Sequence, residues 1–446
     1  MSKKNLPKKK KLDKNKVLKT NISFGMIWKF FNILFIYLTV PLLLNYLGVE
    51  YYGVWATIFT ILNAAYFMDF GISLGVKNKV TEALAKNDFL ASRIYISTAY
   101  FSISIVALTM LLISIIIVMY FNMQNIFNTN ISESELKTTL ILSCILVIFS
   151  VVLNIYKSLL NAVQQSSKVE LAMAIYQGLV FLQILLLPKI INQSLILVGL
   201  IYGATNVLIA IIFSFIFFKN NKALIPSFSY FKKDKINEIL GLGAHFFIIQ
   251  IALIIILTTD NIIITYIIGP EATTTYSIVN KIYQPFIIVS TFIFTPLWTL
   301  YTNAYHNHDF QWIKNTFTKL NRLFLLLVFV LIVLYFSFDW IIKFWIPEPL
   351  IYSKTLLIGF SFFVLIKVYG DIYMTFINGI GRIKLQMWLF ILGALINIPM
   401  SVFFVKYLNF GVSGVILATC ISLLFLAISM PIQAYKVLKN NKQIKL

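Results

Sequence analysis

The chain has 446 residues, of which 59% are hydrophobic and 12% are charged, and its mean hydropathy is +0.86. Soluble domains carry about 25% charged residues, so this composition excludes a soluble protein and indicates an integral membrane protein. The net charge of +21 comes from Lys and Arg that flank apolar runs, which argues against nucleic acid as a partner.

The first predicted element is a basic tail. Residues 1–20 hold nine lysines against Asp13, so we expect a disordered cytoplasmic tail that contacts anionic membrane lipids. The apolar run from Ile22 to Tyr46 that follows is long enough to span a bilayer. No small-x-small cleavage site comes after it, which argues against a signal peptide.

Twelve apolar runs of roughly spanning length divide into two sets of six. Backbone groups in lipid must bond within their own segment, so the runs predict an all-α membrane protein. The predicted domains are a first bundle at 21–218, a basic cytoplasmic linker at 219–238, a second bundle at 239–435 and a basic cytoplasmic tail at 436–446. The runs lie near 23–53 (two runs, the second beginning near Gly53), 94–121, 138–160, 171–188, 195–218, 239–268, 272–300, 323–346, 354–378, 385–407 and 412–435.

The basic residues predict the orientation. If alternate loops are cytoplasmic, 29 of the 37 Lys and Arg lie inside, Lys157 among them, and five lie outside: Lys137, Lys189, Lys343, Lys354 and Lys406. The other three, Lys29, Lys281 and Lys367, lie within predicted spans. This asymmetry predicts a multi-pass membrane protein with both termini in the cytoplasm.

Two stretches predict that the second half repeats the first. Asn154 to Gln164 matches Asp371 to Gly381 in polarity and size at an offset of 217 positions. Leu47 to Glu50 matches Ile268 to Glu271 at an offset of 221 positions. An offset close to half the chain is typical of an internal repeat.

Charged residues inside the first predicted bundle are candidate functional residues, because a charge in the bilayer usually faces a partner or a water-filled cavity. Lys29 lies in the inner third of the first span, and Asn32 follows one turn later. Asp69 lies at a similar depth in the second span. Lys29 and Asp69 either neutralise each other or face a ligand.

The seventh and eighth spans carry a second candidate group. Asp260 and Lys281 lie at similar distances from the predicted outer turn at Gly269, so they either form a buried ion pair or belong to a wider polar stripe. Ser277, Lys281 and Gln284 share one helix face, which favours the stripe.

The tenth span carries the third group. Lys367 and Asp371 are one turn apart, and Thr375 and Asn378 continue the same face. Either the charges neutralise each other within the helix, or the stripe lines a cavity. We predict that Lys29, Asn32, Lys281, Gln284, Lys367 and Asn378 bind the substrate, and that Asp69, Asp260 and Asp371 are candidates for ion coupling.

Several chemistries have no matching motif. The sequence contains no Gly-x-x-x-x-Gly-Lys-Ser/Thr loop and no Cys/His cluster with metal spacing, so we predict no catalytic residues, no metal site and no cofactor other than an H+ or Na+ coupling ion.

Two motifs resemble a known family. They are Leu47-Gly-Val-Glu-Tyr-Tyr-Gly-Val-Trp55 followed by Asp69-Phe-Gly71, and Asp260 to Ala272 followed by Tyr276 and Lys281. The chain resembles the polysaccharide transport family of the multidrug/oligosaccharidyl-lipid/polysaccharide exporter (MOP) superfamily, the O-antigen and capsule repeat-unit flippases. The resemblance implies two six-helix bundles related by a pseudo-two-fold axis, forming a V around a central cavity.

The resemblance also implies a location, the bacterial inner or plasma membrane, and a function. Family members carry a polyprenyl-pyrophosphate-linked oligosaccharide from the cytoplasmic to the outer leaflet, with a polysaccharide polymerase and glycosyltransferases as partners. The alternatives are a cation-coupled drug or small-molecule exporter of the same superfamily, and a membrane-embedded glycan polymerase or ligase. The lack of a long loop argues against such an enzyme, since the longest predicted outer loop, at 122–137, has about sixteen residues.

Overall fold

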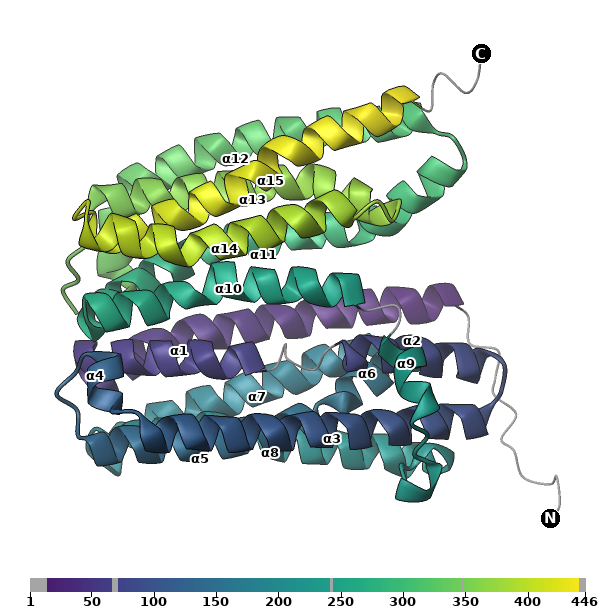
Figure 1. Cartoon of the computed structure of the whole chain (residues 1–446), viewed down its shortest axis with the longest axis horizontal. Coiled ribbons are helices and arrows are strands. Elements are labelled where there is room, and N and C mark those ends of the chain that lie inside the picture. Colours follow the sequence, from purple (N-terminus) through teal and green to yellow (C-terminus); the bar gives the residue numbers. More distant parts are fainter. Residues whose placement is uncertain (1–13, 66–70, 241–243, 347, 441–446) are drawn as a thin grey trace. The chain divides into compact units, whose positions relative to one another are not determined.

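The computed structural model describes residues 14–65, 71–240, 244–346 and 348–440, and every regular element in these ranges is a helix (Figure 1). This confirms the predicted all-α class. The α-helices are α1 (Lys14–Ala65), α2 (Ile72–Ala85), α3 (Phe89–Tyr120), α4 (Met123–Phe127), α5 (Glu133–Leu153), α6 (Ile155–Ala162), α7 (Ser166–Leu186), α8 (Leu195–Asn220), α9 (Asp234–Leu240), α10 (Ala244–Ile267), α11 (Pro270–His306), α12 (Phe310–Trp345), α13 (Lys354–Gly379), α14 (Lys384–Lys406) and α15 (Gly411–Asn440). Three 3-10 turns lie at Leu187–Lys189, Lys222–Leu224 and Phe228–Tyr230.

Within the described ranges, eleven helices are long and apolar enough to cross a membrane, where the sequence analysis counted twelve. The difference lies in the first candidate, Phe24–Ala65, whose 42 residues exceed the roughly 20 that one crossing needs. It consists of two helices joined at Gly48, which has a φ of 69° and a ψ of 174°. Gly48 therefore separates the first two predicted runs, and each of the other ten runs matches one candidate.

Several helices extend beyond their predicted ends, and α12 does so by the most. Helix α11 continues to His306, and α12 begins at Phe310 instead of near 323. Phe310, Ile313, Phe317 and Leu320 are buried and follow a helical spacing, so packing of one apolar face stabilises this early part of α12. The opposite face of this part of α12 is polar, so it contains no continuous apolar run that would predict a span.

The chain forms two compact units whose boundaries differ from the predicted bundles. One comprises Met1–Tyr46, Gly71–Ile117 and Thr138–Gly243, and the other comprises Leu47–Phe70, Val118–Lys137 and Ala244–Leu446. The predicted linker thus belongs to the first unit. The first residues of the second predicted span belong to the second unit, where an added Cβ at Gly53 would lie 1.7 Å from the Pro270 carbonyl oxygen.

The predicted linker packs on α3 of the first unit. The Arg93 side chain donates to the Ile225 carbonyl oxygen at 2.7 Å and lies 4.2 Å from the centre of the Tyr230 ring. The Tyr95 hydroxyl donates to the Glu238 carboxylate at 2.6 Å. A hydrogen bond from Lys235 lowers the pKa of Glu238 below its ordinary value. The linker is therefore a structured part of the first unit.

Turn residues support the predicted internal repeat. Gln164 and Gly381, which are 217 positions apart, both have left-handed φ values, of 60° and 71°. Gly48 and Gly269, 221 positions apart, also have positive φ. These pairs were aligned from sequence similarity, and each pair adopts backbone conformations with the same sign of φ.

Two further turns repeat at the offset of 221. Asn87 and His308 have φ values of 57° and 60°. Each precedes an aspartate, Asp88 or Asp309, whose carboxylate accepts a hydrogen bond from the backbone N–H three residues later. The two halves thus use the same turn and helix cap at equivalent positions.

Equivalent segments also make reciprocal contacts within the second unit. The Thr274 hydroxyl donates to the Val49 carbonyl oxygen at 2.6 Å, and the Gly53 backbone lies against Pro270. Val49 corresponds to Pro270 and Gly53 to Thr274 at the offset of 221. Reciprocal contacts of this kind are typical of a local two-fold arrangement.

Candidate functional site

The first unit contains a cluster of three charged side chains from three helices: Lys29 on α1, Lys157 on α6 and Glu170 on α7. The Glu170 carboxylate interacts electrostatically with both lysines. An added Cβ at Gly25 would lie 3.9 Å from Glu170 Cγ, and Gly25 is one turn before Lys29. Helix packing at Gly25 therefore brings Lys29 close to Glu170.

This cluster carries one net positive formal charge, because two cations share one carboxylate. All three side chains are half-buried. Neither polar side-chain atom of Asn154, which precedes α6, has a hydrogen-bond partner in the described chain, although both are buried. Buried polar groups are normally satisfied, so the Asn154 amide is available to a polar ligand or to water.

The predicted residues of the first unit have different outcomes. Asn32 is buried on α1, three residues after Lys29. Asp69 lies outside the described residues. Glu170, which directly precedes an apolar run, was not among the predicted site residues, and Lys157, predicted to lie in a loop, lies in α6. Glu170 and Lys157 each lie at the edge of an apolar run, and this position could have indicated them as candidate site residues.

The second unit buries the Asp260 carboxylate among side chains from three other helices. Asp260 is 4% exposed. The Tyr276 hydroxyl on α11 donates to its Oδ2 at 2.5 Å, and the Thr419 hydroxyl on α15 lies 3.2 Å from both oxygens. On α14, Asn397 donates its Nδ2 to Thr419 Oγ1 at 3.1 Å. The polar contacts of Asp260 thus come from hydroxyl groups.

The Asp260 site concentrates oxygen atoms in a buried place. A buried carboxylate is costly unless hydrogen bonds or a cation compensate its charge. Thr419 has one hydroxyl proton and so donates to one carboxylate oxygen at a time. Asp260 was a predicted site residue, whereas Asn397 and Thr419 were not, because single polar residues in apolar runs have no distinctive spacing.

The polar stripe of α13 is partly neutralised within its own helix. Lys367 Nζ lies 2.7 Å and 2.5 Å from the two carboxylate oxygens of Asp371. The Thr375 hydroxyl donates to the Asp371 carbonyl oxygen at 2.7 Å. The side-chain amide oxygen of Asn378, Oδ1, is buried and has no hydrogen-bond partner in the described chain. Of the two sequence alternatives for Lys367 and Asp371, the structure shows internal pairing.

The polar stripe of α11 continues onto neighbouring helices. Ser277 donates to Asn261 Oδ1 on α10 at 3.4 Å, and Asn261 donates to the Thr60 hydroxyl on α1 at 2.8 Å. Lys281 is half-buried one turn later, and Gln284 is exposed. The stripe is therefore hydrogen-bonded to neighbouring helices at Ser277 and exposed at Gln284.

A family model described as "Polysaccharide biosynthesis protein" matches residues 18–301, well over half of the chain. The chain belongs to this family. A second family model, MatE, matches residues 246–403, and together the two place this family member in the MOP superfamily. No curated protein sequence gives a significant match.

Solved structures show the same fold for this family member. An inward-facing multidrug resistance MATE family transporter of the MOP superfamily has a TM-score of 0.78 at 12% identity, over 95% of this chain and 98% of that one. An outward-facing structure of such a transporter has a TM-score of 0.67 at 14% identity, over 96% of each chain. A MOP superfamily transporter from Pyrococcus furiosus has a TM-score of 0.59 at 14% identity, over 95% and 94%. The chain thus has the two-bundle fold of these membrane transporters.

Proposed function

We propose that the protein is a flippase that moves a polyprenyl-pyrophosphate-linked oligosaccharide from the cytoplasmic to the outer leaflet for surface polysaccharide synthesis. The observation that carries the proposal is the charged cluster of Lys29, Lys157 and Glu170 in a member of the polysaccharide biosynthesis family. A pyrophosphate is anionic, and the cluster offers it two lysine ammonium groups. Lysine attracts phosphate as a point charge.

The physical need for such a protein is the polar head group. Each sugar hydroxyl that enters hydrocarbon without a hydrogen bond costs several kcal/mol, roughly 2–7 by most reference states. A polar path across the membrane lowers this barrier while the prenyl chain stays in lipid. An inside-negative potential favours outward movement of negative charge by about 2.3 kcal/mol per charge per 100 mV. The membrane potential can thus supply direction.

Ion coupling is the second part of the proposal. The carboxylate of Asp260, with the oxygen atoms of Tyr276, Thr419 and Asn397 around it, is a suitable place for a proton or Na+. Asp371 is a weaker candidate, because Lys367 already neutralises it. Asp260→Asn would therefore reduce ion-dependent transport more than Asp371→Asn.

The test is complementation of a deletion strain with variants of the cluster. Lys29→Ala and Lys157→Ala should each reduce surface glycan by roughly ten- to hundredfold, the equivalent of one charged hydrogen bond. Lys189, an exposed lysine in the 3-10 turn that follows α7, provides the matched control, and Lys189→Ala should leave glycan unchanged. Immunoblots must show equal protein abundance. Normal glycan in both cluster variants would refute this assignment of the binding site.

The alternative is a cation-coupled exporter of small molecules. The MatE match over residues 246–403 and the buried carboxylate of Asp260 favour it. The cationic cluster disfavours cationic drugs as substrates. Drug susceptibility of the deletion strain separates the two, because loss of a flippase removes surface glycan and leaves efflux unchanged.

A further inference from the structure

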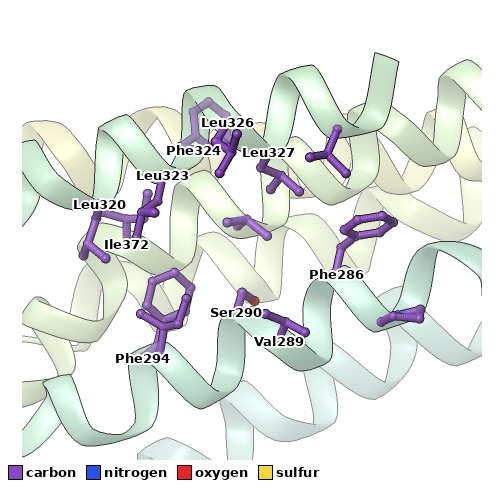
Figure 2. Close-up of a pocket in the computed structure, with 14 residues that line it drawn as sticks. Phe286, Val289, Ser290, Phe294, Leu320, Leu323, Phe324, Leu326, Leu327 and Ile372 are labelled. Atoms are coloured by element: carbon purple, nitrogen blue, oxygen red, sulfur yellow. The ribbon is translucent and has the colours of Figure 1, made fainter. Parts of the chain in front are cut away.

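An apolar groove lies in the second unit, lined by residues of α11, α12 and α13 (Figure 2). Its volume is about 370 Å³, within the range of about 300–1,000 Å³ of small-molecule sites. Figure 2 shows side chains of α11, such as Phe286 and Phe294, across from side chains of α12, such as Leu323 and Leu327. The groove is large enough for part of a ligand.

The apolar lining of the groove favours a hydrocarbon as its ligand. Ser290 is the one polar residue among its fourteen lining residues, and its hydroxyl donates to the Ile287 carbonyl oxygen of its own helix at 2.7 Å. Water in such a place lacks the two to four polar partners that it needs. Val289 and Leu326, which line the groove, are 56% and 57% exposed, so the groove opens at the surface of two candidate membrane spans.

Charged and polar residues lie next to lining residues of the groove on three helices. On α11, Pro285 lines the groove one turn after Lys281 and next to Gln284. On α13, Val368 and Ile372 line it, and each directly follows a charged residue, Lys367 or Asp371. On α12, Leu320 and Leu323 line the groove, and each directly follows a basic residue, Lys319 or Arg322. Because Lys367 and Asp371 neutralise each other, Lys281, Lys319 and Arg322 give the region a net positive formal charge. An apolar groove beside a cation suits a hydrocarbon chain with an anionic head.

We propose that this groove binds the first isoprene units of the polyprenyl chain, with the pyrophosphate next to Lys281. The inference rests on the proposed function, since it assigns a place to the lipid part of that substrate. Membrane phospholipids can also place an acyl chain in an apolar groove, but the adjacent cation favours a chain that ends in a multiply charged anion. The groove would therefore bind polyprenyl pyrophosphates in preference to membrane phospholipids.

Photolabelling tests where the chain binds. A polyprenyl pyrophosphate with a diazirine in its first isoprene units is added to the full-length protein in vesicles. Labelling should concentrate on α11 and α12 peptides at the groove, and unlabelled polyprenyl pyrophosphate should displace it. If a diazirine phosphatidylcholine labels the same peptides and polyprenyl pyrophosphate does not displace it, the groove holds bulk lipid and the proposal is wrong.

Groove-filling variants test what the groove does. Val289→Trp and Leu327→Trp should each slow flipping of a long-chain substrate by about tenfold, the discrimination expected of a filled hydrophobic pocket. Both variants should flip a short-chain analogue, in which the same head group carries no isoprene units, at the wild-type rate. Ile332→Trp is the matched control, because Ile332 is 51% exposed on α12 and does not line the groove.

The outcomes separate this inference from the proposed function. If the wild-type protein flips the substrate and the filled variants flip it equally fast, the groove assignment is wrong and the flippase proposal stands. If the wild-type protein flips neither the long-chain nor the short-chain substrate, the flippase proposal itself is wrong.

Discussion

The two halves of the chain share their turns but hold their charges differently. In the first half, Glu170 interacts with lysines on two other helices. In the second half, Lys367 and Asp371 pair within one helix. A pair on one helix forms wherever that helix forms, whereas a cluster from three helices depends on how they pack. The charges of the first half are thus the ones that helix movement can rearrange.

Breaking the local pair should have the largest effect on stability. Lys367→Ala leaves the Asp371 carboxylate buried without its cation, which should cost about 3–5 kcal/mol. Lys29→Ala should cost less, because Glu170 keeps its interaction with Lys157. Thermal unfolding in detergent measures both. The double variant Lys367→Ala/Asp371→Ala should recover most of the loss, and equal losses for Lys367→Ala and Lys29→Ala would contradict the comparison.

The repeated turns offer a matched pair of backbone substitutions. Gly381→Gln places a side chain in the left-handed region and should destabilise the protein by about 1–2 kcal/mol. A Cβ at Gly381 meets no atom within 4 Å, so the effect would report backbone strain alone. Gln164→Gly relieves the same strain in the first half and should have the opposite or no effect on the melting temperature. Destabilisation by both variants would show that the two turns are not equivalent.

Substitutions at the two repeated helix caps should change the free energy of unfolding least, and by nearly equal amounts. Asp88→Ala and Asp309→Ala each remove a carboxylate that accepts a backbone N–H, so each should cost about 1 kcal/mol. Asp→Asn at the same positions keeps an acceptor and serves as the control. Chemical denaturation of the four variants checks the expectation. A large effect in one half alone would indicate that its aspartate has a second role.

The predicted helices were close to those observed because membrane spans depend on local composition. Ten predicted runs each match one candidate span, and the aligned pairs at Gly48 and Gln164 mark turns of the predicted repeat. The largest difference between a predicted run and an observed helix is the start of α12. The early part of α12 is held by one buried face and not by continuous apolarity, so a search for apolar runs missed it.

The candidate site was less predictable than the fold. Lys29, Lys367, Asp371 and Asp260 were identifiable because a charge in an apolar run is conspicuous. The residues that contact these charges were only partly predictable from the sequence. Lys367 and Asp371 are one turn apart, and this local spacing allowed their pairing to be considered from sequence. Glu170 is 141 positions from Lys29, and Thr419 is 159 positions from Asp260, distances along the chain at which no helical spacing links two residues.

The sequence by itself determined the membrane class, nearly all of the spanning segments, the internal repeat and the charges that lie within the spans. These follow from composition and from spacing along one helix. The tertiary structure alone decided which helices bring Lys157 and Glu170 to Lys29, which hydroxyls surround Asp260, and where the apolar groove lies. The physical reason is that these features form where side chains from separate helices meet, and side-chain packing between helices sets their positions.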